Sequence, residues 1–239
     1  MKNQLEVSIV IPAYDEEYRI LSTLKNYQGF FSEKFKNKFE IIVVSNNCSD
    51  RTFELVSNFL KKNKGIVNLN IPTYSGKGGA VMKGFKISKG KWVGFVDADG
   101  SVDAENFYKL YEKINGFSGI IASRRGKGAV VLDRSLMERF SSLVFNKIVV
   151  FLFNLKFKDT QCGAKLFDRK TALFLVDNCS EKGWIFDVDL LNICKKNDIK
   201  IIELPIRWVG KSGSKLDFYG KISSLLKLFI YKYNQSKKC

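Results

Sequence analysis

The sequence predicts an α/β fold with a mostly parallel sheet flanked by helices. Short, nearly continuous apolar runs alternate with amphipathic helical patterns through the first half of the chain, as in parallel strands that are covered on both faces. No repeat, low-complexity tract or linker divides the 239 residues, a length that suits one large domain. The hydrophobic content of 45% is enough for a packed core and argues against a disordered chain. We therefore expect a single domain over residues 1–239.

The first half of the chain contains the clearest strand and helix patterns. Strands are predicted at residues 7–11, 39–44, 68–71, 92–96 and 117–122. Helices are predicted at residues 15–27, from Asp50 through an apolar face of Phe53, Val56, Phe59 and Leu60, and at residues 78–88. Because strands and helices alternate here, we expect parallel β-α-β units with right-handed crossovers.

The second half is less regular. It predicts a long helix at residues 133–157, a mixed loop and strand at 159–167, a short helix at 187–195 and a last strand at 199–204. Apolar residues then recur at helical spacing among lysines near the C-terminus. The apolar stripe is Ile222, Leu225, Leu226, Phe229, Ile230 and Tyr233, and the lysines are Lys221, Lys227, Lys232 and Lys237. This stripe has two interpretations, packing in the core or an interfacial helix at a membrane.

The composition excludes several kinds of site. The chain has no histidine, which rules out a Ser-His-Asp triad, a Cys-His pair and every zinc site that needs histidine. Its five cysteines are scattered without a C-x-x-C pair, so we expect reduced thiols in a cytosolic protein. The formal net charge of +16 attracts polyanions such as nucleic acid, anionic lipid or phosphorylated substrates, without choosing among them.

No segment is predicted to cross a membrane. Residues 1–6 are polar and the apolar run after them stops at Pro12, unlike a signal peptide. The most apolar internal stretch, residues 143–157, is interrupted by Asn146, Lys147 and Asn154. We therefore expect any membrane association to be peripheral.

Two acids, Asp97 and Asp99, follow the predicted strand at residues 92–96. Open α/β sheets place their ligands at the carboxyl ends of strands, and residues two apart point to the same side if the strand geometry continues. Two like charges at close range are costly unless a cation compensates them, and Mg²⁺ and Mn²⁺ prefer such oxygen ligands. The alternative is an acidic turn that caps the helix from Asp103 onward.

Two further turns have functional and plain interpretations. The turn at residues 12–17 carries acids that either line a ligand or complement a helix dipole, and it lacks the glycines of a dinucleotide-binding fold. The segment at residues 75–79 does not have the spacing of a P-loop. It is either a basic, backbone-rich turn against a phosphate or a plain flexible loop.

Five segments at strand ends resemble, in order, the motifs of the family 2 glycosyltransferases. They lie at residues 11–16, 44–52, 76–80, 97–99 and 122–124. Two later segments, at residues 159–167 and 184–189, are similar to the D-T-Q-C-G-F-K-L-F and W-x-F-D-V-E segments of the dolichyl-phosphate glucosyltransferase branch, which is related to dolichol-phosphate mannosyltransferases. The resemblance spans roughly residues 7–215. A departure occurs after the second strand, where Ser45 and Asn46 replace the usual Asp-Asp pair.

The resemblance implies a GT-A fold with a Rossmann-like sheet. It divides the chain into a nucleotide-sugar-binding half (residues 5–123), an acceptor-binding half (124–215) and a basic amphipathic tail (216–239). It implies inverting, metal-dependent transfer of a hexose to a polyprenyl or dolichyl phosphate at the cytoplasmic, inner face of the membrane. The segment at residues 161–163 favours UDP-glucose as donor. GDP-mannose, UDP-N-acetylglucosamine and a glycan hydroxyl acceptor remain alternatives.

The same resemblance assigns the site residues. Donor-binding residues are Pro12, Tyr14, Glu16, Asn46, Lys77, Asp97 and Ala98, and the Mg²⁺ or Mn²⁺ ligands are Asp97 and Asp99. Acceptor-binding residues are Arg124, Arg125, Arg134, Arg139 and Gln161, and the catalytic residues are Asp99, Asp187 and Arg124. A lipid phosphate is already anionic near neutral pH and needs little or no general base, whereas a sugar hydroxyl would need one. Asp187 is then the candidate base, or else a helix cap.

Two rival functions remain at this point. A nucleic-acid-binding module would explain the positive charge, but the sequence contains no recognised motif for it, and we expect no nucleic-acid partner. An inactive scaffold with the same fold is the second rival, against which the intact acid pair argues.

Overall fold

The computed structural model describes residues 4–211 and 218–236, without the side chains of residues 218–222, 224 and 236. It confirms the predicted α/β class. A seven-stranded sheet has the order β3-β2-β1-β4-β7-β5-β8, and a small second sheet pairs β6 with β9. The strands are β1 (Val7–Ala13), β2 (Phe39–Asn46), β3 (Ile66–Ile71), β4 (Trp92–Val96), β5 (Gly119–Ser123), β6 (Val130–Leu132), β7 (Ala164–Asp168), β8 (Ile201–Pro205) and β9 (Arg207–Val209).

The sheet is mostly parallel, as predicted. Strand β1 pairs in parallel with β2 and β4, and β2 pairs in parallel with β3. Strand β7 is the exception, because it lies antiparallel between β4 and β5. As a result, the carboxyl ends of β1, β2 and β4 meet the start of β7 at one edge of the sheet.

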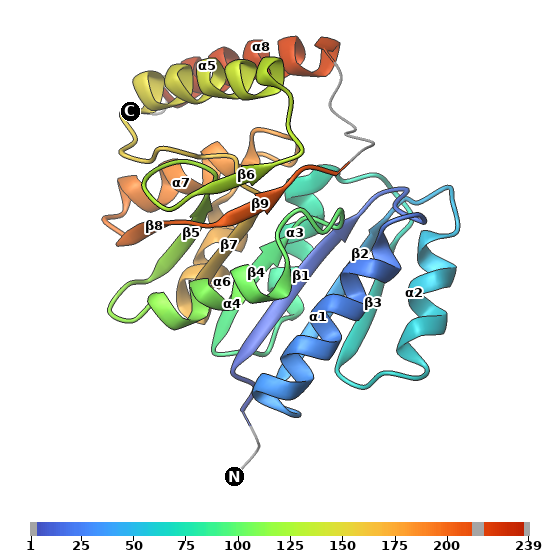
Figure 1. Ribbon diagram of the computed structural model, residues 1–239. Helices are drawn as coiled ribbons and strands as arrows, with labels where there is room; N and C mark the ends of the chain where they lie inside the picture. Colours follow the sequence, from blue (N-terminus) through green and yellow to red (C-terminus); the bar gives the residue numbers. More distant parts are fainter. Residues whose placement is uncertain (1–3, 212–217, 237–239) are drawn as a thin grey trace.

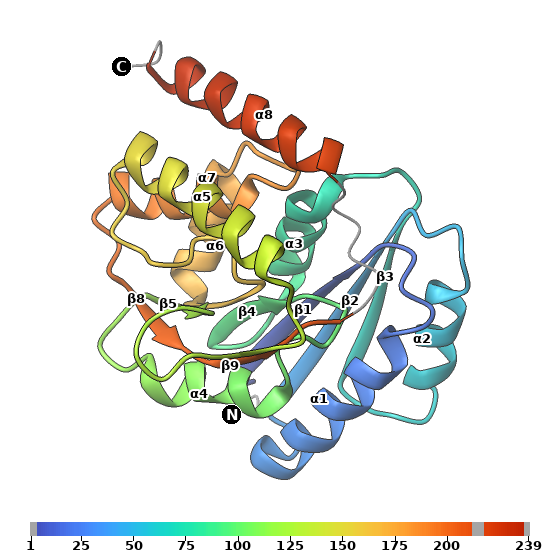
Figure 2. The ribbon, with the colours of Figure 1, turned by 45° about the horizontal axis from the view of Figure 1, so that its top comes forward.

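Helices cover both faces of the sheet. They are α1 (Ile20–Phe35), α2 (Thr52–Leu60), α3 (Gly76–Ile87), α4 (Ala104–Lys113), α5 (Leu136–Phe153), α6 (Arg169–Asn178), α7 (Phe186–Lys196) and α8 (Phe218–Ser236). Helices α1, α2 and α4 pack on one face, and α3, α6 and α7 pack on the other (Figure 1). Helices α5 and α8 lie side by side as an outer layer over this second face (Figure 2).

Two apolar clusters, one on each face, hold the layers together. Fully buried side chains of α1, such as Tyr27 and Phe31, pack against β2 and α4 on the first face. On the second face, Phe85 of α3 packs against Phe95 of β4 and Phe167 of β7. Every residue of β2 is buried, which explains its nearly continuous apolar sequence.

The prediction of a helix at residues 15–27 was wrong at both ends, because α1 starts at Ile20 and continues to Phe35. The preceding turn is held by tertiary hydrogen bonds instead of a helical ladder. The N–H of Glu16 donates to Thr52 Oγ1 at 2.7 Å, and the N–H of Glu17 donates to Asp50 Oδ2 at 2.9 Å. Asp15 adopts a positive φ of 48°, which no helix tolerates.

The second half contains elements that the sequence analysis missed. Helix α6 starts immediately after β7, and Asp168 caps it by accepting a hydrogen bond from the Thr171 N–H at 2.7 Å. The short strands β6 and β9 were also not predicted, because each spans only three residues. The predicted long helix is confirmed as α5, which begins with a capping box of Ser135 and Glu138.

The predicted C-terminal stripe lies in α8, but packing in the core was the wrong interpretation for four of its members, because Leu226, Phe229, Ile230 and Tyr233 are exposed. The neighbouring Leu228 and Tyr231 face the core instead. The side chains of Lys221 and Ile222, together with residues 216, 217 and 237–239 of the predicted tail, lie outside the described residues. Within the described part of the chain, no helix combines the length and apolar character needed to cross a bilayer.

Candidate functional site

The candidate site lies where β1, β2 and β4 end. The turns after these strands are bonded to one another, since the N–H of Ser49 donates to Asp15 Oδ1 at 2.7 Å. The carbonyl of Ala98 accepts a hydrogen bond from Thr23 Oγ1 at 2.8 Å. Asp15, Cys48 and Asp50 also lie close enough together for one ion, but the two carboxylates already accept hydrogen bonds from backbone N–H groups. These contacts fix the shape of the site's rim.

Asp97 and Asp99 leave β4 at this edge. The backbone N–H of Asp97 donates to the carbonyl of Gly163 at 2.9 Å, and Asp99 Oδ1 accepts from the Ser101 N–H at 2.9 Å. Burial and the nearby charge of Asp97 raise the pKa of Asp99 above its usual value. Helix α4 is capped by Asp103 and not by this pair. Two crowded carboxylates of this kind fit a hard divalent cation.

Gly163 makes room for the first of these acids. A Cβ atom at this position would lie only 1.9 Å from Asp97 Oδ2. Gly163 directly precedes β7. Because glycine has no side chain, the carboxylate of Asp97 can lie against its backbone. Gly163 belongs to the segment at residues 159–167 but was not predicted as a site residue.

A chain of alternating charges runs inward from Asp97. Its Oδ1 atom lies 2.6 Å from Lys77 Nζ, which is 4.0 Å from Asp187 Oδ2. The other oxygen of Asp187 lies 2.5 Å from Nζ of Lys165, a fully buried lysine that also donates to the Cys162 carbonyl. Burial alone would lower the pKa of Lys77, but the charges of Asp97 and Asp187 raise it. The two carboxylates therefore stabilise the protonated, positively charged form of Lys77.

Asp187, the candidate base, lies in the first turn of α7 and is 3% exposed. The N-cap of this helix is Ile185, so Asp187 is not its capping residue. Its carboxylate faces Lys165 and Lys77 instead. Lys165 was missed as a site residue, although it belongs to the quoted segment at residues 159–167.

The predicted phosphate turn is the N-terminus of α3. Gly76 has a positive φ of 68°, and a Cβ there would lie 2.2 Å from the Lys182 carbonyl oxygen. The amide of Asn46 clamps this turn, because its Oδ1 accepts from the Ser75 N–H at 2.9 Å and its Nδ2 donates to the Gly76 carbonyl at 3.2 Å. A helix N-terminus with an adjacent lysine is a ready site for a phosphate group.

Asn46 was predicted to lie near the nucleotide base. The structure places it 2% exposed beneath the turn, with both ends of its amide bonded. The more open part of the rim is formed by Tyr14 and Tyr74, whose ring centroids lie 5.2 Å apart in an edge-to-face arrangement. Glu16 is engaged by Arg19 in a 2.7 Å ion pair. Pro12, in β1, is partly buried behind this rim.

The predicted acceptor residue Arg124 lies at the end of β5. Its guanidinium makes two hydrogen bonds to the buried carboxylate of Asp159, at 2.7 and 2.8 Å. Burial alone would lower the pKa of Arg124, but Asp159 raises it well above its usual value, with a smaller contribution from Asp97. The segment that holds Arg124 also contacts the acid pair, because the carbonyl of Gly163, four residues after Asp159, accepts from the N–H of Asp97 at 2.9 Å.

Arg124 and Arg134 flank Trp208 from β9, with guanidinium carbons 5.7 and 5.5 Å from the ring. Burial, and then the charge of Arg124, lowers the pKa of Arg134 to about 10. Two guanidinium groups are thus held against one aromatic ring, an arrangement that suits an anion site. Neither Asp159 nor Trp208 was predicted, because their partners lie 35 or more residues away in the sequence.

The other predicted acceptor residues are more dispersed. Arg125 donates to the Lys158 carbonyl at 2.6 Å and to Ser142 Oγ at 2.9 Å, which ties the arginine segment to α5. Arg139 donates to the Val131 carbonyl at 2.9 Å on the exposed side of α5. Gln161 is half-buried, and its N–H donates to Asp159 Oδ1 at 3.4 Å.

Comparison with known proteins gives consistent matches. Residues 8–174 match the family model described as glycosyl transferase family 2. The chain is 34% identical over 239 residues to a dolichyl-phosphate beta-glucosyltransferase of Trichomonas vaginalis, which covers 95% of this chain and 70% of the relative. It is 33% identical to the dolichyl-phosphate beta-glucosyltransferase of Saccharomyces cerevisiae, covering 89% of this chain and 70% of the relative.

Solved structures match over nearly the whole chain. Mannosyl-3-phosphoglycerate synthase from Rubrobacter xylanophilus aligns with a TM-score of 0.69 and 14% identity, covering 98% of this chain and 76% of the other. Glucosyl-3-phosphoglycerate synthase from Mycobacterium tuberculosis, solved with Mn²⁺, UDP-glucose and phosphoglyceric acid, aligns with a TM-score of 0.67 and 16% identity, covering 95% and 79%. At these identities the likeness shows the fold alone, and it confirms the GT-A fold.

Proposed function

The chain belongs to glycosyl transferase family 2, and we propose that it transfers glucose from UDP-glucose to a dolichyl or polyprenyl phosphate at the cytoplasmic surface of a membrane. That it is a glycosyltransferase follows from the family and from relatives above 30% identity. The named relatives support glucose as the sugar and dolichyl phosphate as the acceptor. We carry both over to this chain as part of the proposal.

One observation supports this assignment above the others. The acid pair, Asp97 and Asp99, and the arginine cluster around Arg124 converge on one edge of the sheet, because the segment at residues 159–163 contacts both. Asp159 accepts hydrogen bonds from Arg124, and the carbonyl of Gly163 accepts from the N–H of Asp97 at 2.9 Å. A reaction between a nucleotide sugar and a phosphate needs this arrangement. Metal-binding acids must neutralise the leaving diphosphate, while cations hold the attacking phosphate in line with the anomeric carbon.

On the donor side, Asp97 and Asp99 would hold Mg²⁺ or Mn²⁺, which supplies positive charge to the departing diphosphate. Lys77 and the N-terminus of α3 add a second source of positive charge beside the same group. Asn46 contributes by holding the turn at Ser75 and Gly76 in place. We propose that the nucleoside lies along the rim formed by Pro12, Tyr14 and Glu16, with the backbone of Ala98 beside it.

On the acceptor side, Arg124 and Arg134 would bind the lipid phosphate, with Arg125, Arg139 and Gln161 around them. A phosphate monoester is mostly dianionic near neutral pH, so its oxygen attacks without first losing a proton to a base. Direct displacement then inverts the anomeric centre. Asp187 would act as a base only for a hydroxyl acceptor, and its burial between two lysines favours the phosphate.

Purified protein incubated with Mn²⁺ or Mg²⁺, polyprenyl phosphate and labelled nucleotide sugars tests the proposal. We expect label from UDP-glucose in the organic phase, and none with Asp99→Ala. Separate incubations with UDP-N-acetylglucosamine and GDP-mannose test the alternative donors. Absence of a lipid product with every donor would contradict the proposed reaction, while product from another donor would correct only the sugar.

A further inference from the structure

Helices α5 and α8 present apolar side chains on the outside of the molecule. On α5, Leu136, Met137, Phe140 and Phe151 are between 68% and 84% exposed. On α8, Leu226, Phe229, Ile230 and Tyr233 are between 52% and 61% exposed. These eight side chains, which we name the α5–α8 face, belong to neighbouring helices of the outer layer (Figures 1 and 2). Such a concentration of exposed apolar side chains indicates an interaction surface.

The α5–α8 face consists of two apolar stripes, one on each helix. The exposed residues of α5 follow helical spacing on the side opposite Val149 and Phe153, which are buried. Among the described side chains of α8, the buried ones are Leu228 and Tyr231, which point inward. The core of the described residues therefore does not include these exposed side chains, whose outer surfaces lie on the outside of the molecule.

The charged residues of the two helices are almost all basic, although Glu181 lies in the neighbouring loop. Together, α5 and α8 contain one acidic residue, Glu138, and five basic ones. The basic residues are Arg139, Lys147, Lys221, Lys227 and Lys232. Lys147 is exposed within the apolar stripe of α5, and Lys227 is exposed beside that of α8. Apolar stripes bordered by lysines match an anionic lipid surface, whereas an apolar protein partner would not select this charge.

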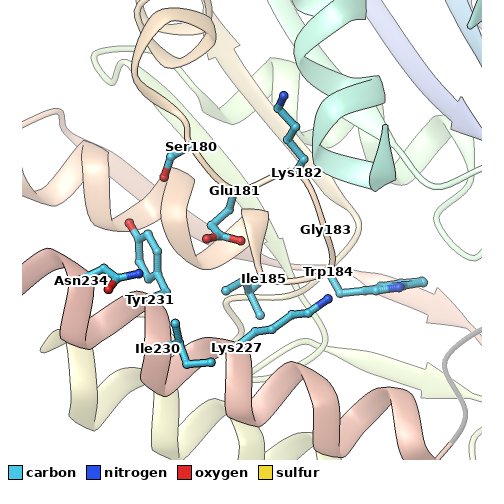
Figure 3. Close-up of a pocket in the computed structure, with 10 residues that line it drawn as sticks. All are labelled: Ser180, Glu181, Lys182, Gly183, Trp184, Ile185, Lys227, Ile230, Tyr231 and Asn234. Carbon is cyan, nitrogen blue, oxygen red and sulfur yellow. The ribbon is translucent and has the colours of Figure 1, made fainter. Parts of the chain in front are cut away.

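A pocket beside α8 extends the face (Figure 3). It has a volume of about 420 Å³ and lies between α8 and the loop at residues 180–185. Ile230 belongs both to the pocket lining and to the face, and Trp184 stands 41% exposed at the rim. Figure 3 shows the Lys227 amine reaching toward Trp184. Tryptophan and lysine together are typical of the boundary between lipid headgroups and acyl chains.

The arginine cluster is joined to the start of this face. Arg134 precedes α5 and donates to the Glu138 carbonyl at 3.2 Å, and Arg125 donates to Ser142 on the same helix. We infer that the α5–α8 face lies on an anionic phospholipid bilayer. This inference rests on the proposed function, because it places the arginines at the height where a lipid phosphate emerges while its chain stays in the membrane.

Vesicle sedimentation tests the inference without any lipid acceptor present. The probes are vesicles of phosphatidylcholine alone and of phosphatidylcholine mixed with phosphatidylserine. We expect binding to the mixed vesicles that weakens as salt is added. A Lys147→Glu/Lys227→Glu variant should bind them about thirtyfold more weakly or worse, since each lysine near the surface contributes appreciably to binding. Lys83→Glu/Lys86→Glu, with the same charge change on exposed residues of α3, should retain more of the binding.

The apolar part is tested with Phe140→Glu/Phe151→Glu, against Phe117→Glu on an exposed loop away from the face. We expect loss of vesicle binding only in the first, with activity on a water-soluble short-chain polyprenyl phosphate retained. If the wild-type protein does not bind the mixed vesicles, the inference is overturned. A dimer, seen by light scattering, that Phe140→Glu/Phe151→Glu converts to a monomer without any lipid binding would also overturn it. Lipid binding without transferase activity would instead contradict only the proposed function.

Discussion

Nζ of Lys77 lies 2.6 Å from Oδ1 of Asp97, so a cation from the start of α3 pairs with the first acid of the proposed metal site. The same ammonium lies 4.0 Å from Asp187 Oδ2. Lys77 is thus placed between a group that would bind metal and a buried carboxylate. In the proposed reaction, Lys77 would exchange Asp97 for the diphosphate of the donor.

Lys77→Met should separate metal binding from catalysis. We expect tighter Mn²⁺ binding, because no ammonium competes for Asp97, measured by titration calorimetry on the protein without substrates. We expect kcat/KM to fall by about 10²–10³, the usual cost of removing one preorganised charge partner of a leaving group. Lys83→Met, an exposed lysine of the same helix, should change neither quantity. Unchanged activity in Lys77→Met would remove Lys77 from the site.

The buried pair of Lys165 and Asp187 should reveal itself in stability. Removing one partner of a buried ion pair leaves an uncompensated charge, so Asp187→Asn and Lys165→Met should each lower the free energy of unfolding by about 3–5 kcal/mol. The double variant should be more stable than either single one, because neither charge remains. Urea unfolding of the four proteins measures this coupling.

The same variants separate two roles for Asp187. If Asp187 positions Lys165 and Lys77, the remaining activity of Asp187→Asn with a lipid phosphate keeps the pH profile of the wild type. Loss of the acidic limb of that profile would instead identify Asp187 as a general base.

The strand cores and the acid pair were predictable because their signals are local. The apolar runs of β1, β2 and β4, and the acids directly after β4, can be recognised within a few residues. The start of α1 could not be predicted in this way, because the turn before it depends on hydrogen bonds from Glu16 and Glu17 to residues more than 30 positions away.

The partners of the site residues were hidden for a related reason. Asp159 and Trp208 reach Arg124 only because β7 and β9 fold back toward the end of β5. The contacts of Lys165 could not be predicted for the same reason. Lys165 lies in the core because β7, which contains it, is inserted antiparallel between β4 and β5. Periodicity identifies elements, but it does not reveal which of them become neighbours across the sheet.

The Arg124–Asp159 pair should give a defined acid dependence. Burial alone would raise the pKa of Asp159, but Arg124 holds it well below its usual range. Stability from this pair is therefore complete above the unfolded-state pKa of about 3.9 and is lost as the pH falls toward the depressed folded-state value. Asp159→Asn should be less stable at neutral pH, and its unfolding free energy should fall less steeply than that of the wild type below about pH 4. Equal slopes in urea unfolding would show that Asp159 is not held ionised.

Gly163→Ala tests whether the geometry of Asp97 matters to metal binding. The added Cβ would lie 1.9 Å from Asp97 Oδ2, so the carboxylate must move away from its present position. We expect weaker Mn²⁺ binding and a large loss of transfer. Gly29→Ala is the matched control, because a Cβ on this residue of α1 has nothing within 4 Å. It should leave metal binding unchanged and raise stability by about 0.5–1 kcal/mol, as alanine favours a helix interior over glycine. Full Mn²⁺ affinity in folded Gly163→Ala would show that the metal does not depend on Asp97 as oriented here.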